Sequence, residues 1–341
     1  MTPAVLLAGA VLLALVLYAL LGGADFGGGI WDLLASGPRR GEQRALVERA
    51  IGPVWEANHV WLVLVVVLLF TGFPAAFAAL CVSLFAPITL LLVGIVLRGA
   101  TFTFRAYDHP RDEVQRRWGL AFSLSSFLAP VMLGLVVGAV ASGRAAPQAA
   151  TVPAPLGWLT PFTLAVGLFA SALFAFLSAA YLAVEAEGPL RQDFRVRALV
   201  AGAAVFGCAV TVAILSRREA PAVFAGLTRR SFTLPLHLAT GVSAVTALSA
   251  LARGRVRLGR AAAVAQVTLI VLGWGASQFP YLVPPDLTVN GAAAPRATLV
   301  ALLWALAGGA VLLFPALAFL FRVFKGERAF AVMDGEPRRR A

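Results

Sequence analysis

Residues 53–71 read PVWEANHVWLVLVVVLLFT, and every residue from Val60 to Phe70 is apolar. A helix of about 20 residues is long enough to cross the hydrocarbon core of a bilayer. Similar blocks recur along the chain, so that 60% of its 341 residues are apolar and only 13% are charged. Soluble proteins average roughly 45–50% apolar and about 25% charged residues. The sequence therefore predicts an all-α polytopic membrane protein.

Nine apolar blocks are long enough to span a membrane. They are Ala4–Leu21, Pro53–Thr71, Ala78–Leu97, Trp118–Ser142, Gly157–Val184, Val196–Leu215, Phe232–Leu251, Ala261–Val283 and Ala297–Phe321. The first block has no basic segment before it and no cleavage site after it, so we expect a retained helix and not a signal peptide. Pro87 and Pro130 lie inside blocks and predict kinks at packed interfaces. The longest connection, residues 22–52, contains an amphipathic stretch from Arg40 to Ile51 that we expect on the membrane surface.

The distribution of Lys and Arg predicts the orientation of the chain. Of the 28 basic residues, 22 lie in the alternate connections and the C-terminus that share one side of the membrane. Because cytoplasmic loops are enriched in Lys and Arg, we expect the N-terminus outside and the C-terminus in the cytoplasm. Four arginines in an outer connection break this pattern, namely Arg217, Arg218, Arg229 and Arg230. Either that connection has a role of its own or the two flanking blocks are wrongly placed.

Composition and residue placement exclude several classes of function. The net charge of +12 does not indicate nucleic-acid binding, because the basic residues are spread between apolar blocks. Cys81 and Cys208 lie in separate apolar blocks and predict neither a disulfide nor a metal site. Of the three histidines, His59, His109 and His237, no two are placed to bracket a haem within the membrane. We therefore expect the chain to bind no metal and no redox centre by itself.

Ionisable residues near membrane depth are the candidate functional groups, because each needs a partner or a purpose there. Asp25 follows the first block, and Glu56 lies in the first turn of the second. His59 is three residues after Glu56 and is expected on the same helix face. Arg98 and Arg105 lie two helical turns apart at the end of the third block.

Two interpretations of these residues stay open from the sequence. In a structural interpretation, the helix dipole stabilises the carboxylates and Arg98, with Arg105, neutralises them. In a functional interpretation, Glu56, Asp25 and His59 exchange protons on the cytoplasmic side.

Two motifs connect the chain to a known family. The first is IGPVWEANHVWL at 51–62, with Trp55, Asn58 and Trp61 as its distinctive residues, and the second is LRGATFTFR at 97–105. With these motifs the chain resembles subunit II of the cytochrome bd-type quinol oxidases, including their cyanide-insensitive relatives. The likeness extends over nearly the whole length and includes the Gly-rich segment around Asp25.

The resemblance implies a fold and an activity. The family fold has two four-helix bundles, here residues 1–142 and 157–283, a ninth span at 297–321, and in this chain a basic cytoplasmic tail at 322–341. Subunit II pairs with subunit I, which carries haems b558, b595 and d and the quinol site. The complex lies in the bacterial cytoplasmic membrane, oxidises quinol and reduces O₂ to water, as an electrogenic, proton-translocating enzyme.

The resemblance also implies roles for residues and ligands. Carboxylates at the positions of Glu56 and Asp25 are associated with a cytoplasmic proton route towards the haems. Some members hold a quinone in subunit II as a structural lipid, and a small single-span accessory subunit is a further expected partner. Many members have Asp-Gly-Asn where this chain has Glu56-Ala57-Asn58, and His59 replaces a Gln or Glu.

Two other classes of function also fit features of the sequence. Nine spans with Gly and Pro interruptions and a carboxylate at membrane depth also fit a proton-coupled secondary transporter or channel. The sequence has no detectable inverted repeat, however, and its blocks are nearly empty of polar groups at their centres. The third possibility is an assembly subunit whose carboxylates only hold the fold together.

Overall fold

The computed structural model describes residues 2–52, 55–107, 112–146 and 156–325. Its helices are α1 (Pro3–Leu20), α2 (Gly22–Leu33), α3 (Arg40–Ile51), α4 (Trp55–Gly72), α5 (Pro74–Ser83), α6 (Phe85–Tyr107), α7 (Asp112–Ala141), α9 (Pro161–Glu185), α10 (Gly188–Glu219), α11 (Pro221–Thr228), α12 (Thr233–Ala252), α13 (Val256–Gln278) and α14 (Arg296–Lys325). Two short antiparallel strands, β1 (Tyr281–Val283) and β2 (Leu287–Thr288), connect α13 to α14.

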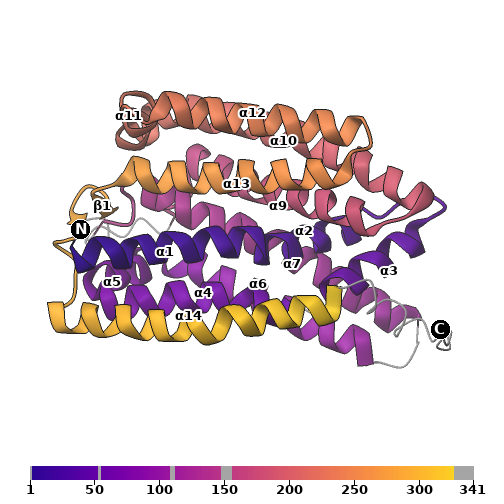
Figure 1. The fold of residues 1–341 in the computed structure, drawn as a ribbon, viewed down its shortest axis with the longest axis horizontal. Helices are drawn as coiled ribbons and strands as arrows, with labels where there is room; N and C mark the ends of the chain where they lie inside the picture. Colours follow the sequence, from indigo (N-terminus) through magenta and orange to yellow (C-terminus); the bar gives the residue numbers. More distant parts are fainter. Residues whose placement is uncertain (1, 53–54, 108–111, 147–155, 326–341) are drawn as a thin grey trace.

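Nine helical segments in this described part are long and apolar enough to cross a membrane, which confirms the predicted number of spans. They run side by side along the long axis of the molecule (Figure 1). One end carries α11 and the strands, and we refer to it as the predicted outer end. The other carries α3 and is the predicted inner end. Part of the predicted basic tail, residues 326–341, lies outside the described residues, and the division into two four-helix bundles stays a prediction.

The first span is longer than the sequence predicted. Helix α2 continues α1 almost directly, and together Pro3–Leu33 form one span. The Gly-rich segment is therefore part of a span and not of the connection that we expected at residues 22–52. Glycine is a poor helix former in isolation, so tertiary packing decides this segment's conformation.

The third span also differs from its predicted bounds of Ala78–Leu97. The chain breaks at Leu84, between the short helix α5 and the span Phe85–Phe104. Pro87 consequently lies in the first turn of α6, where a missing N–H leaves no hydrogen bond unmade, and does not kink a span as predicted. This shift of seven residues places Arg98 inside the span and not at its end.

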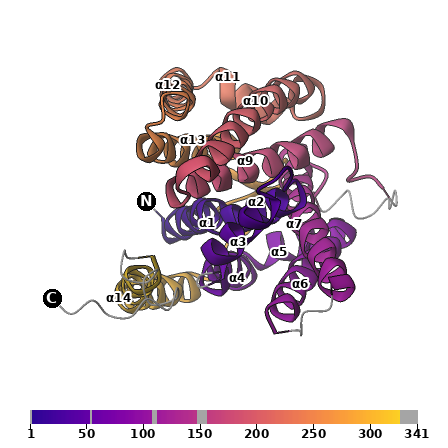
Figure 2. The same cartoon turned by 90° about the vertical axis from the view of Figure 1, so that its right-hand side faces the viewer.

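Helix α9 is the most buried span and packs against α2, α7, α10 and α13. Viewed from the predicted inner end, α2 and α9 lie near the centre of the molecule, and α14 lies at its edge (Figure 2). Close helix approach in this centre depends on glycine. A Cβ on Gly134 of α7 would lie 2.6 Å from the Cα of Gly167 in α9. On Gly27 of α2, it would lie 2.0 Å from the carbonyl oxygen of Phe174.

Polar contacts fasten α3 to α10 at the predicted inner end. Arg39 Nε donates to Asp193 Oδ2 at 2.8 Å, and Gln43 Nε2 donates to the same oxygen at 3.0 Å. The Asp193 carboxylate raises the pKa of Arg39, so this guanidinium keeps its charge. Leu46 and Ile51 lie on the buried, apolar face of α3, as expected for an amphipathic surface helix.

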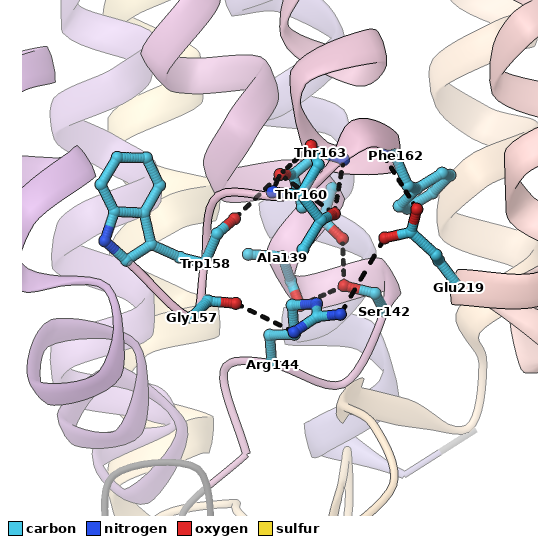
Figure 3. A network of polar contacts seen from close by, with 10 residues as sticks. Ala139, Ser142, Arg144, Gly157, Trp158, Thr160, Phe162, Thr163 and Glu219 are labelled. Atoms are coloured by element: carbon cyan, nitrogen blue, oxygen red, sulfur yellow. Dashed lines mark hydrogen bonds and ion pairs between the residues drawn. The ribbon is translucent and has the colours of Figure 1, made fainter. Parts of the chain in front are cut away.

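A second polar network joins three helix ends at the predicted outer end (Figure 3). Glu219, at the end of α10, accepts a hydrogen bond from the backbone N–H of Phe162 in the first turn of α9. Arg144, just after α7, lies 3.9 Å from the Glu219 carboxylate and donates to the carbonyl of Gly157 at 2.9 Å. The network holds the ends of α7, α9 and α10 together.

The four outer arginines lie at or near helix C-termini. Arg217 and Arg218 are in the last turn of α10, and Arg229 follows α11. Arg230 donates to the carbonyls of Ala276 and Phe279 at the end of α13. Cations are favourable beside the unpaired carbonyls of a helix C-terminus. This local stabilisation explains basic residues on a side where the charge distribution predicts few.

We predict that Gly27→Ala destabilises the protein, because its new methyl group overlaps the backbone of Phe174. Overpacking of this kind costs about 1–3 kcal/mol or more. Thermal unfolding of the purified complex in detergent measures the effect. Gly9→Ala is the matched control, since a Cβ there meets nothing within 4 Å. Equal unfolding temperatures for the two variants would contradict the proposed α2–α9 contact.

Candidate functional site

Asp25 is a buried carboxylate within the first span, nearer its predicted inner end. It lies in α2, and only 4% of its surface is exposed. Asn58 of α4, equally buried, donates a hydrogen bond from Nδ2 to Asp25 Oδ2 at 2.8 Å. Two of the predicted residues, from helices far apart in sequence, are thus brought into direct contact.

Arg98 of α6 is the largest fully buried side chain in the described part, with 1% of its surface exposed. Its guanidinium lies against the rings of Phe26 and Phe122, at 5.0 and 5.4 Å from their centroids. It also interacts electrostatically with the Asp25 carboxylate. A desolvated cation is stabilised by aromatic faces and by a nearby anion, and Arg98 has both.

His59 of α4 completes this cluster. Its Nε2 lies 3.4 Å from Nη1 of Arg98, and its ring packs against Tyr18, Phe26 and Trp55. A guanidinium has only donors, so the contact requires the imidazole nitrogen to accept. This geometry favours a neutral His59, because a protonated ring would set two cations in contact. We name the four residues Asp25, Asn58, His59 and Arg98 the Asp25 cluster.

Several buried polar atoms around the Asp25 cluster have no hydrogen-bond partner within the described part of the chain. They are the Tyr18 hydroxyl, Asn58 Oδ1, His59 Nδ1, and Nε and Nη2 of Arg98. An unsatisfied buried polar group costs about 1–3 kcal/mol. In folded proteins such groups are usually satisfied by ordered water. The cluster is therefore a polar, water-attracting site within apolar surroundings.

Glu56 lies apart from this cluster. It begins an exposed stripe on α4 that continues through Val60, Val63, Val67 and Phe70. Glu56 and His59 were expected on one helix face, but Glu56 points out of the chain and His59 packs inside it. For Arg105, the second predicted charge partner, the side chain lies outside the described residues.

The remaining motif residues support the cluster. Trp55 packs on His59 and Phe102, and Trp61, 4% exposed, contacts the ring of Phe314 in α14. Together with Asn58, they direct the buried face of α4 towards α2, α6 and α14.

A second buried carboxylate, Asp32, lies near the end of α2 and is not among the residues predicted from the sequence. It is 1% exposed, and Ser123 Oγ of α7 donates to its Oδ2 at 3.0 Å. Arg44 of α3 lies 3.8 Å from Oδ1. The signal was its spacing, since Asp32 follows Asp25 by seven residues and so lies on the same helix face two turns further on.

The described residues do not fit a haem held between two histidines of this chain. His59 is bound into the Asp25 cluster near the predicted inner end. His237 lies near the predicted outer end, and its Nδ1 lies 2.6 Å from the carbonyl of Thr233. His109 lies outside the described residues. Within the described ranges, no three His, Cys, Asp or Glu side chains are grouped as metal ligands, and Cys81 and Cys208 are unpaired.

Comparisons with known proteins identify relatives, one of which matches over nearly the full length. The putative cytochrome bd menaquinol oxidase subunit II of Bacillus subtilis is 25% identical over 326 residues, which cover 92% of this chain and 93% of that protein. The cytochrome bd-I ubiquinol oxidase subunit 2 of Escherichia coli is 25% identical over 202 residues, which cover 57% of this chain and 52% of that protein.

A solved structure shares the fold. A chain of the bd oxidase from Geobacillus thermodenitrificans superposes with a TM-score of 0.79 at 23% sequence identity, and the match covers 95% of this chain and 99% of that one. The family model for cytochrome bd terminal oxidase subunit II matches residues 3–324. The chain therefore belongs to the cytochrome bd terminal oxidase subunit II family and is a multi-pass membrane subunit of an oxidase complex.

Proposed function

We propose that this chain is the haem-free subunit of a quinol:O₂ oxidoreductase, and that it has two tasks. It stabilises the haem-bearing subunit I, and it carries part of the path by which protons reach the site of O₂ reduction from the cytoplasm. Family membership supports the first task. The Asp25 cluster supports the second.

The single observation that carries the proton path is a carboxylate buried at membrane depth beside unpaired polar atoms. Asp25 can take up and release a proton, whereas Arg98 stays charged and holds the site's electrostatics constant. Water molecules bound to the unpaired atoms of Tyr18, Asn58 and His59 would connect the carboxylate to its surroundings. In this arrangement the main role of His59 is to position Arg98 and water, and proton transfer through its own ring is secondary.

Glu56 would be a further proton-accepting group on the same path. A carboxylate on an exposed face of a span is costly in lipid. We propose that subunit I covers the α4 stripe from Glu56 to Phe70, so that Glu56 lies between the two subunits. Its longer side chain, compared with the Asp of many relatives, extends its reach across such an interface.

The cofactors of the complex belong to the partner in this proposal. Haems b558, b595 and d in subunit I would supply electron transfer from quinol to O₂. A structural quinone in this chain and a small accessory subunit remain expectations from the family. The named relatives use different quinols, menaquinol in one and ubiquinol in another, so both are candidates here.

The proposed location is the bacterial cytoplasmic membrane, with the N-terminus outside and the C-terminus inside. This orientation places the Asp25 cluster and Glu56 nearer the cytoplasm, from which the protons come. The transporter or channel alternative has no comparable support, because the chain belongs to an oxidase family over nearly its whole length.

We predict that Asp25→Asn lowers quinol-driven O₂ reduction about tenfold or more, because the amide cannot carry a proton. The asparagine can still accept the hydrogen bond from Asn58, but Arg98 loses its counter-charge, so turnover is compared per haem of the assembled complex. Oxygen consumption measures the turnover. Glu187→Gln is the matched control, since it removes an exposed carboxylate at the same end of the molecule. Wild-type turnover in an assembled Asp25→Asn complex would refute the proton role.

Glu56→Gln is expected to slow O₂ reduction while the complex assembles with its haems. The neutral side chain keeps its shape but cannot pass a proton across the proposed interface. Turnover per haem, measured by oxygen consumption, tests this expectation. A fully assembled variant with unchanged turnover would remove Glu56 from the path and leave Asp25 in it.

Arg98→Leu is expected to destabilise the complex more than the double change Arg98→Leu/Asp25→Asn. Removing one of two opposite buried charges that interact costs about 3–5 kcal/mol, because the other charge stays buried alone. The yield of haem-containing complex and its unfolding temperature report the difference. If the double variant is no more stable than the single one, Arg98 does not compensate the charge of Asp25.

A further inference from the structure

Asp32 is a carboxylate in an unfavourable position. It is the second-last residue of α2, where the helix dipole is negative and an acidic side chain costs about 0.3–1 kcal/mol. It is also 1% exposed, and its Oδ2 accepts a hydrogen bond from the hydroxyl of Ser123, which is itself 1% exposed. Neither helix capping nor solvation explains its presence.

Asp32 lies beside a side chain that reaches the predicted inner surface. Arg44, in the surface helix α3, lies 3.8 Å from Asp32 Oδ1 and also donates to the Asp32 carbonyl at 3.3 Å. The Arg44 side chain keeps 31% of its surface exposed. The separation of 3.8 Å exceeds a hydrogen bond, and in the route proposed below water reaches the carboxylate beside this partly exposed side chain.

From Asp32, buried hydroxyl groups continue along α7 towards Asp25. Ser126 lies one turn beyond Ser123 and is fully buried. It faces α2 at Gly29, where a Cβ would lie 2.1 Å from the Ser126 oxygen. The absent side chain thus lets a hydroxyl lie directly against the α2 backbone between Asp32 and Asp25.

The remaining gap lies between Ser126 and the Asp25 cluster. Gly29 and Asp25 are four residues apart, about 6 Å along the helix axis. One or two water molecules bridge such a distance between polar groups. The unpaired Nε and Nη2 of Arg98, which packs on Phe122 of the same stretch of α7, offer donors to such water.

We propose that Asp32 takes up protons at the predicted inner surface and passes them through Ser123, Ser126 and intervening water to Asp25. This proposal rests on the proton role of Asp25 proposed above and adds the route by which protons reach Asp25. In one passage, a hydronium ion or protonated buffer at the surface gives a proton to the Asp32 carboxylate and is left as water or the buffer base. The hydroxyls and water then each release one proton and accept another, and Asp25 gains the proton that Asp32 gives up. No electron moves.

The test uses the complete purified complex with quinol and O₂. Asp32→Asn is expected to lower turnover about tenfold, with a larger loss at pH 8 than at pH 6, because supply limits the reaction when protons are scarce. Asp32→Glu, which restores a titratable group, is expected to recover most of the turnover at both pH values. A purely structural role predicts neither the pH dependence nor rescue by a longer acid.

Ser126→Ala provides an independent measurement in case Asp32 variants assemble poorly. Ser125→Ala is its matched control, because Ser125 is also buried and its hydroxyl, like that of Ser126, donates to the carbonyl of Phe122. Of the two, only Ser126 is placed against Gly29 of α2. We expect Ser126→Ala to slow turnover several-fold with an intact haem spectrum, and Ser125→Ala to leave it unchanged. Equal turnover in the two serine variants would overturn the route.

The outcomes separate this proposal from the one it extends. If Asp25→Asn abolishes turnover while Asp32→Asn and Ser126→Ala do not affect it, protons reach Asp25 by another way and the route proposed here is wrong. If none of the three variants affects turnover, the proton role of Asp25 fails as well.

Discussion

A guanidinium buried within a membrane-spanning helix is the constraint on which the centre of this protein depends. Moving an ion out of water costs several kcal/mol even after relaxation, unless a counter-charge and hydrogen bonds are supplied. Arg98 meets its counter-charge in Asp25, its aromatic faces in Phe26 and Phe122, and its acceptor in His59. These partners come from α2, α4 and α7, so the four helices must converge around one side chain.

That convergence explains why a glycine-rich segment is helical. Its glycines let α2 approach α9 at Phe174 and α7 at Ser126 more closely than any side chain would permit. Each glycine weakens the isolated helix by about 1 kcal/mol relative to alanine. The contacts offset this loss only in the folded protein. The same absence of side chains leaves room for a hydroxyl group between the two carboxylates of α2. The glycines thus serve both the close packing of the helices and the proposed proton route.

The two acidic positions of the family motif region have separate surroundings. Asp25 is enclosed by its own chain, whereas Glu56 lies on an outward stripe of α4 with apolar residues along it. In an oxidase complex, an enclosed carboxylate can store a proton under conditions set by this subunit alone. The protonation of an outward-facing carboxylate depends on the partner or lipid that covers it. This separation fits the proposed path, in which Asp25 acts within this chain and Glu56 acts at an interface with a partner.

The sequence alone determined the number of spans and the family, because hydrophobic length and motif spacing are local properties. It did not determine which face of each span points inward. In a membrane the lipid-facing side chains are as apolar as the core, so periodicity does not distinguish the two. Only the tertiary structure placed Asp25 beside Asn58 and Arg98, turned Glu56 outward, and revealed Asp32. It also moved the start of α6 to Phe85, because the break at Leu84 lies inside the block that the sequence predicts as one span. These features depend on contacts between distant helices, which no single segment encodes.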